Sequence, residues 1–199
     1  MLLQEKLKGK RLILASKSPR RQALLHGCGL AFEIAADYEV EERYPDGLSA
    51  VEIPIYLAHL KSGAYPHELA EGDILITADT VVVLEGEVLG KPCDREEAVA
   101  MLTALSGQRH TVVTGVVIRS AHDEEAFRVQ TDVWFRKLRQ EEIEHYVDQY
   151  QPYDKAGAYG IQEWIGYVGI GRIEGSFYNV MGLPIQSLYV NLEKFLDRL

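Results

Sequence analysis

Short apolar runs alternate with amphipathic stretches along the chain, a pattern typical of a protein with both strands and helices. Residues 12–14 form an apolar run of the kind that a buried strand needs. Residues 74–84 give the strongest strand signal because they are rich in β-branched side chains. Apolar spacing and start signals predict helices that begin at Pro19, near Ser49 or Pro54, at Asp94, at Glu141 and at Leu183.

The other predicted strands follow one another closely, with tight turns between several of them. They cover residues 30–36, 88–89, 111–119, 127–135, 167–173 and 177–180, the last two as a pair around Glu174-Gly175. Strands joined by tight turns pair in antiparallel fashion. The sequence therefore predicts an α/β fold with a mixed, largely antiparallel central sheet flanked by helices. No linker or repeat interrupts residues 1–199, which predicts a single domain.

The start of the first major helix carries an unusual charge pattern. Ser18 is the predicted N-cap and Pro19 the first helical residue. Arg20 and Arg21 then fall in the first turn, where the helix dipole disfavours a cation by about 0.3–1 kcal/mol. First-turn N–H groups and two guanidinium groups would together bind a phosphate. The alternative is two solvated arginines on a surface helix.

Asp79 interrupts the strongest predicted strand. A carboxylate inside such an apolar run is costly to bury without a partner. Asp79 is therefore expected to point into a cleft or to meet a cation or a metal. Lys61 and Lys91 are isolated in the sequence, and Lys61 is most simply a solvated lysine on a helix.

Composition and charge narrow the classes of function. The chain has 199 residues and a formal net charge of −9, which argues against stable nucleic-acid binding. No run approaches the roughly 20 apolar residues of a membrane span, and no secretory segment is seen at the start, so a cytoplasmic protein with no membrane partner is expected. Cys28 and Cys93 follow no metal or redox spacing.

Four clusters of polar residues lie within or between the apolar elements, at Ser16–Arg21, Glu41-Glu42, Asp79-Thr80 and Asp154–Gln162. Basic side chains suit phosphate oxygens, and carboxylates suit a hard divalent cation such as Mg²⁺. The combination predicts metal-assisted phosphoryl chemistry. There is no P-loop and no Gly-x-Gly-x-x-Gly after a strand, so neither a Walker-type NTPase nor a dinucleotide enzyme is indicated.

The chain resembles the Maf family of nucleotide pyrophosphatases over about Leu12 to Tyr189. The motifs that carry the resemblance stand in family order: LASKSPRR from Leu14, VEE from Val40, TADTVV from Thr77, GKP from Gly90, SGQRHTVVTGV from Ser106, DKAGAYGIQ from Asp154 and GSFYNVMGLP from Gly175. The resemblance implies hydrolysis of a nucleoside triphosphate to the monophosphate and pyrophosphate with Mg²⁺ or Mn²⁺. It also implies a homodimer and an elongated two-lobed, anticodon-binding or ITPase-like architecture with a central cleft.

The resemblance assigns roles to individual residues. It implies that Asp79 is the catalytic proton acceptor, acting with Lys61, Lys91 and Glu42. The chemistry of the residues agrees, since the carboxylates of Glu42 and Asp79 could hold the metal. A run of acidic residues leaves the register uncertain, so Glu41 is an alternative to Glu42. The implied substrate-binding residues are Ser16, Arg20, Arg21, Thr80 and Gln162. The AYGIQ sequence that ends at Gln162 resembles the subgroup acting on dTTP and UTP. The chemistry agrees, since a glutamine amide can pair with both O4 and N3–H of a uracil or thymine ring.

Two other functions compete with this interpretation. The first is a non-enzymatic, nucleotide-binding regulator, because the family's name comes from an association with septum formation and cell-division control. The second is a purine-type triphosphatase that removes damaged nucleotides. Housecleaning of non-canonical nucleotides is also compatible with the pyrophosphatase itself. A pure binding protein has no need of a carboxylate such as Asp79 amid substrate phosphates, which favours the enzyme.

Overall fold

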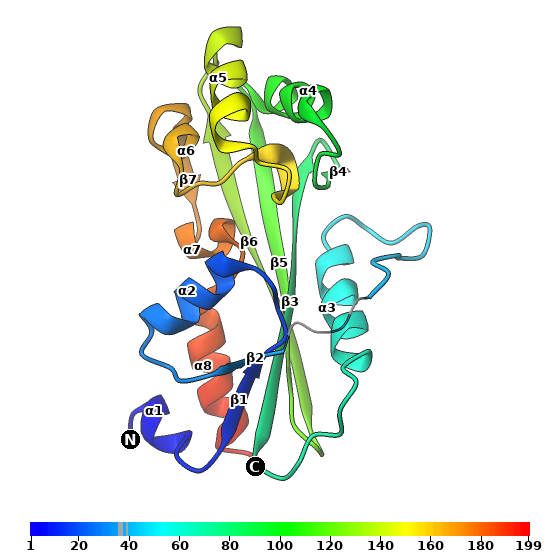
Figure 1. The fold of residues 1–199 in the computed structure, drawn as a ribbon, viewed down its shortest axis with the longest axis vertical. Coiled ribbons are helices and arrows are strands. Elements are labelled where there is room, and N and C mark those ends of the chain that lie inside the picture. Colours follow the sequence, from blue (N-terminus) through cyan, green and yellow to red (C-terminus); the bar gives the residue numbers. More distant parts are fainter. Residues whose placement is uncertain (36–37, 39) are drawn as a thin grey trace. The chain divides into compact units, whose positions relative to one another are not determined.

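The computed structural model describes residues 1–35, 38 and 40–199. Its strands are β1 (Arg11–Leu14), β2 (Glu33–Ile34), β3 (Asp73–Leu84), β4 (Glu87–Leu89), β5 (Arg109–Arg119), β6 (Glu124–Phe135) and β7 (Ile170–Glu174). The sheet order is β2-β1-β3-β5-β6-β7, with β4 paired to β3 (Figure 1). The strand expected over residues 30–36 is shorter than predicted, and Ala36 lies outside the described residues.

The sheet is mixed, as the sequence predicts. β1 pairs in parallel with both β2 and β3, with Leu14 opposite Ile34 and Ile76. β4 and β7 pair in antiparallel fashion with β3 and β6. The turn from β3 to β4 places Glu85 and Gly86 at positive φ, as a two-residue hairpin turn of the favoured twist requires.

Helices flank the sheet, which confirms the predicted α/β class. They are α1 (Leu3–Lys6), α2 (Pro19–Gly27), α3 (Ile53–Gly63), α4 (Arg95–Leu105), α5 (Gln140–Tyr150), α6 (Trp164–Gly169), α7 (Phe177–Met181) and α8 (Ile185–Leu196). The Ser18 side chain accepts a hydrogen bond from the backbone N–H of Arg21 and caps α2, and Asp94 caps α4 in the same way through Glu97. Both caps satisfy backbone donors that helix starts leave unpaired.

Contacts divide the chain into two compact units. The first unit comprises Met1–Asp79, Thr114–Val129 and Gly182–Leu199, and the second comprises Thr80–Val113 and Gln130–Met181. The two-lobed architecture with a central cleft stays a prediction.

In the first unit, α3 packs tightly against the sheet. A Cβ built on Gly115 of β5 would lie 2.4 Å from the backbone of Ile55, so only a glycine allows this approach. The Thr77 hydroxyl of β3 donates to the backbone carbonyl of Ala58 at 2.7 Å. Figure 1 shows α3 on one side of β3, with α2 and α8 on the other side. These contacts fix the helix that carries Lys61 against the strand that carries Asp79.

The second unit has its own apolar core, in which α4 packs on α5. A 3₁₀ turn, Ala156–Ala158, brings the segment after α5 back to the end of β4, where the Gly157 N–H donates to the Gly90 carbonyl at 3.0 Å. Gly157 has a φ of 67°, and a Cβ there would lie 2.9 Å from the Val82 side chain. A glycine is therefore needed for this close approach.

The predicted strand pair 167–173 and 177–180 is wrong in large part. Only β7 is a strand, because residues 164–169 form α6 and residues 177–181 form α7. The Asn179 side chain is buried and donates to the Val112 carbonyl and to the Thr131 hydroxyl. These tertiary bonds, together with the Ser176 hydroxyl that accepts from the Asn179 N–H, outweigh the strand propensity of the local sequence.

Candidate functional site

Asp79 ends the part of β3 that belongs to the first unit and is 7% exposed. Its Oδ1 atom accepts a hydrogen bond from Nζ of Lys61 at 2.5 Å. Lys61 comes from the last turn of α3, and its side chain is only 16% exposed. The interpretation of Lys61 as a solvated lysine is therefore wrong, because the packing of α3 against β3 brings its ammonium group to a buried carboxylate.

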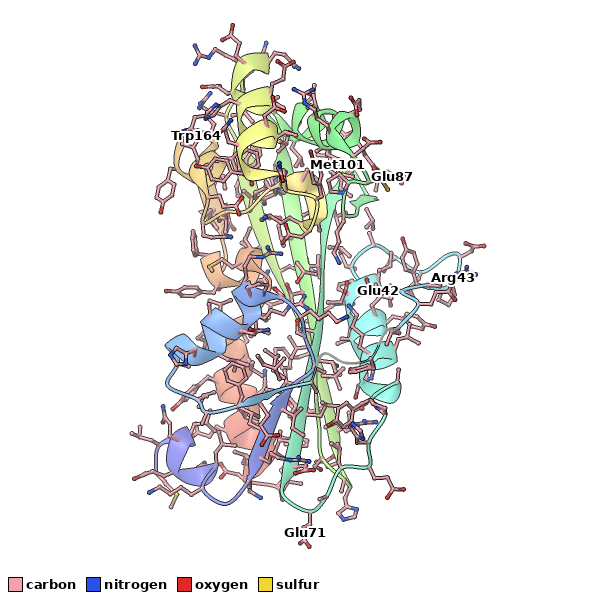
Figure 2. The ribbon with its side chains drawn as sticks, in the orientation of Figure 1. Glu42, Arg43, Glu71, Glu87, Met101 and Trp164 are labelled. Atoms are coloured by element: carbon pink, nitrogen blue, oxygen red, sulfur yellow. The ribbon has the colours of Figure 1, made fainter. Side chains whose placement is uncertain are left out.

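The same ammonium group also binds Glu42. Lys61 Nζ lies 2.9 Å from Oε1 of Glu42, so one cation lies between the carboxylates of Glu42 and Asp79. Glu41 instead pairs with Arg43 at 2.6 Å and is largely exposed. Figure 2 labels Glu42 and Arg43 on the loop before α3. Of the two acidic residues left open by the sequence, Glu42 is the one that shares a cation with Asp79.

Burial and charge set the protonation of Asp79 in opposite directions. Burial raises the pKa of this carboxyl group, and the positive charges of Lys61 and Arg21 oppose that rise. The carboxylate of Glu42 acts in the same direction as burial. A carboxylate with a raised pKa accepts a proton more readily than an ordinary surface aspartate, which suits a general base.

The start of α2 supplies the other groups of the first unit. The Arg21 guanidinium donates to the backbone carbonyls of Ala78 at 2.9 Å and Gly182 at 2.7 Å, and lies 3.4 Å from the Ser16 hydroxyl. Burial lowers the pKa of Arg21, an effect opposed by the charge of Asp79 and assisted by that of Arg20. Arg21 therefore braces the backbone beside Asp79 and adds positive charge there. The first unit thus brings together Ser16, Arg20, Arg21, Glu42, Lys61 and Asp79.

Thr80, Lys91 and Gln162 belong to the second unit. Thr80 is half-buried on β3, and Lys91 is exposed just after β4. The Oε1 atom of Gln162 is buried and has no hydrogen-bond partner among the described residues. A buried acceptor without a partner is costly unless a ligand supplies a donor. The Gly157–Gly90 hydrogen bond ties the segment that leads to Gln162 to the residue before Lys91.

Three residues around Gln162 did not appear among the predicted site residues. Lys155 and Glu163 form an ion pair at 3.2 Å, and the Tyr146 hydroxyl donates a short hydrogen bond to Glu163. The one available signal in the sequence was Glu163 itself, a charged residue directly after the AYGIQ sequence. The roles of Lys155 and Tyr146 depend on contacts that only the folded chain shows.

The donor set in the first unit fits a divalent metal. Glu42 and Asp79 present carboxylate oxygens to one shared cation, Lys61, and Mg²⁺ is commonly held by one or two carboxylates together with substrate phosphates. Within residues 1–35, 38 and 40–199, no group of three or more His, Cys, Asp or Glu side chains is placed to hold a metal alone. Glu42 and Asp79 would hold such an ion only with further ligands from substrate or water.

No helix in the described part of the chain is long and apolar enough to cross a membrane.

Comparisons with known proteins match nearly the whole chain. Residues 11–195 match the family model described as Maf-like protein. A dTTP/UTP pyrophosphatase of Parabacteroides distasonis is 52% identical over 191 residues, which cover 96% of this chain and 99% of the relative. A dTTP/UTP pyrophosphatase of Bacteroides thetaiotaomicron is 52% identical over 183 residues, with 92% and 95% coverage.

Solved structures show the same fold at much lower sequence identity. The Staphylococcus aureus Ham1 protein superposes with a TM-score of 0.52 at 16% identity, covering 94% of this chain and 100% of that one. The family match and the near-full-length relatives agree with the motifs around Arg21, Asp79 and Gln162. This chain therefore belongs to the Maf family.

Proposed function

We propose that this protein hydrolyses dTTP and UTP to the nucleoside monophosphate and pyrophosphate. The observation that carries the proposal is the buried Asp79 carboxylate, held at 2.5 Å by Lys61, which also binds Glu42. A buried acid with neighbouring cations suits proton transfer beside a highly charged phosphate chain. Relatives at 52% identity are named dTTP/UTP pyrophosphatase, which supports the same substrates for this chain.

In the proposed reaction, Asp79 accepts a proton from a water molecule as the water oxygen attacks the α-phosphorus. The bond between the α-phosphorus and the oxygen that bridges to the β-phosphate breaks, and pyrophosphate leaves. Lys61 and Lys91 offset the negative charge of the triphosphate, and Arg21 supports the backbone beside Asp79. A divalent metal bound by Glu42 and Asp79 would supply further charge neutralisation at the reacting phosphate.

Gln162 is the proposed base-reading residue. Its buried Oε1 atom has no partner among the described residues and would accept the N3–H of uracil or thymine. Its amide N–H would donate to O4 of the same ring. Cytosine presents an unprotonated N3 and an amino group. The Gln162 oxygen would then face an acceptor, and its amide N–H would face a donor. Ser16, Arg20 and Thr80 are proposed to contact the substrate on the strength of the family resemblance.

The family's connection to septum formation and a housecleaning role remain expectations from the resemblance. A nucleotide-binding regulator would bind UTP without turning it over, so measured turnover separates it from the enzyme. A purine-type triphosphatase would act on purine nucleotides, including damaged ones, ahead of UTP.

The test is hydrolysis of UTP in ¹⁸O-labelled water, with products identified by mass spectrometry. Attack at the α-phosphorus predicts UMP that carries the label and unlabelled pyrophosphate. Release of UDP and inorganic phosphate, label in the pyrophosphate, or no turnover with either Mg²⁺ or Mn²⁺ would overturn the proposal. Excess chelator should abolish turnover, and added Mg²⁺ should restore it. Full activity in excess chelator would contradict the proposed role of a divalent metal.

A further inference from the structure

Glu163 lies directly after the proposed base-reading residue and has a partner for each carboxylate oxygen. Its Oε1 atom lies 3.2 Å from Nζ of Lys155, and its Oε2 atom accepts a short hydrogen bond from the Tyr146 hydroxyl. Lys155 is only 8% exposed and also binds Asp154 at 2.7 Å. A carboxylate with both oxygens partnered, one of them by a buried ammonium group, is held in one geometry.

Tyr146 extends this network to the backbone on the other side of Gln162. Its hydroxyl oxygen accepts the N–H of Gly160 at 3.0 Å while its proton goes to Glu163. Tyr146 is fully buried on α5, so it is a fixed anchor. Burial and the Glu163 carboxylate raise the pKa of Tyr146, which keeps the hydroxyl protonated and able to donate. The Glu163 N–H also donates to the Gly160 carbonyl at 3.0 Å.

Gly160 lets the side chains of Gln162 and Glu163 lie against its bare backbone. A Cβ at Gly160 would lie 2.8 Å from Cδ of Glu163 and 3.0 Å from Nε2 of Gln162. A second close contact lies just beyond, where a Cβ at Gly166 would lie 1.8 Å from the Ile161 carbonyl oxygen. The backbone on either side of Gln162 is therefore closely packed against its neighbours.

We propose that Glu163, held by Lys155 and Tyr146, is a positioning residue that fixes the Gln162 amide for the uracil or thymine ring. The inference rests on the proposed function, because it assigns the precision of base selection to this network. Glu163 touches neither phosphate nor water in this role. Its loss frees the backbone around Gln162, so that the amide turns and the preference between UTP and CTP shrinks.

The test compares kcat and KM for UTP and CTP in wild type, Glu163→Ala and Tyr146→Phe. Both variants should lower the UTP-to-CTP ratio of kcat/KM by about 10-fold, mainly through a higher KM for UTP, with kcat for UTP within about two-fold of wild type. Glu163→Gln loses the ion pair with Lys155 but keeps an amide oxygen that accepts from Tyr146, so its ratio should fall less and stay within about three-fold of wild type.

Asp148→Asn is the matched control. Asp148 lies two residues beyond Tyr146 on the same helix and pairs with Arg95 of α4 at 2.6 Å. Its loss removes an ion pair of the same unit and should leave the ratio unchanged. A ratio that falls equally in Asp148→Asn would overturn the inference, because general loosening of the unit would then explain it.

The remaining outcomes separate this inference from the proposed function. A wild-type preference for UTP that survives in Glu163→Ala and Tyr146→Phe overturns the inference alone, as does an equal loss of kcat/KM for UTP and CTP. If Glu163→Ala does not fold, the result for Tyr146→Phe tests the inference alone, because this variant loses only the hydroxyl and keeps the buried ring. Failure of both to fold makes the network purely structural and overturns the inference. Absence of UTP hydrolysis by wild type overturns both proposals.

Discussion

At the scale of single residues, the proposed reaction depends most on Asp79, which acts as the base. Asp79→Asn keeps the size of the side chain and removes its ability to accept the proton. A general base contributes typically about 10²–10⁴-fold, so kcat for UTP should fall within that range. The thermal midpoint should not fall, because the substitution removes a buried charge and leaves Lys61 its contact with Glu42. Retention of more than about a tenth of kcat would contradict the assignment of the base.

His110 gives a pH dependence of stability that is independent of the proposed reaction. It is 2% exposed, its Nε2 lies 2.7 Å from the Tyr159 hydroxyl, and burial lowers its pKa from 6.5 to about 4. The unfolded chain therefore binds a proton at His110 that the folded chain does not, between about pH 6.5 and pH 4. This contribution to stability is complete above pH 6.5 and is lost as the pH falls.

The predicted loss in free energy of unfolding from His110 is about 3 kcal/mol between pH 7 and pH 4. Urea unfolding of wild type and His110→Gln at several pH values in this range gives the free energy of unfolding as a function of pH. The difference between the two slopes is the contribution of His110, because the carboxylates contribute equally to both proteins. His122→Gln, in an exposed loop position, is the control and should keep the wild-type slope. Parallel pH curves for wild type and His110→Gln would show that His110 is not held neutral.

The sequence predicts several of the site residues, but it does not predict which side chains they contact. Asp79 is conspicuous because a carboxylate inside an apolar strand needs an explanation, and Gln162 because of the motif that it ends. Without the family resemblance, Lys61 is most simply a surface lysine, since its contact with Asp79 depends on how α3 packs against β3. The role of Tyr146 is equally invisible, because it arises from a contact with Glu163 across 17 positions of sequence.

At the scale of elements, the position of α3 determines where Lys61 lies. Gly115→Ala would place a Cβ 2.4 Å from the backbone of Ile55 and push α3 away from β5. Overpacking of this kind costs typically about 1–3 kcal/mol. We expect a lower thermal midpoint together with reduced kcat, because Lys61 moves away from Asp79.

Gly63→Ala is the matched control for the movement of α3. Gly63 lies in the same helix, and a Cβ there meets nothing within 4 Å. Alanine should stabilise the helix by about 0.5–1 kcal/mol and leave kcat unchanged. Full activity of Gly115→Ala at an unchanged thermal midpoint would show that the close approach of α3 does not position Lys61.

Elements with strong local signals were predicted well. The start of α2 follows from Ser18 and Pro19, and that of α4 from Asp94, because caps act within one turn. Prediction failed at residues 164–181, where α6 and α7 replace most of an expected strand pair. There the buried Asn179 of α7 bonds to residues of β5 and β6, and no local pattern reveals partners so distant along the chain.

At the scale of the whole molecule, the family resemblance predicts a homodimer. Sedimentation equilibrium at micromolar concentration should give twice the 22.4 kDa mass of the chain. A single species with the mass of the chain, unchanged as the concentration rises, would contradict the prediction. The same measurement in high salt shows whether apolar contacts or charges hold the copies together, because salt screens charge pairs and strengthens apolar association.

The preference for one base over the others is the property that the proposed function predicts most sharply. We would measure kcat/KM for dTTP, UTP, CTP, dCTP, ATP and GTP with Mg²⁺, by pyrophosphate release, in wild type and Gln162→Leu. Each buried group left unpaired costs about 1–3 kcal/mol, so dTTP and UTP should exceed the cytosine nucleotides by about 10-fold or more. Gln162→Leu should remove that preference and keep part of the turnover. A wild type that prefers a purine nucleotide, or a Gln162→Leu variant that keeps the wild-type ranking, would contradict the account.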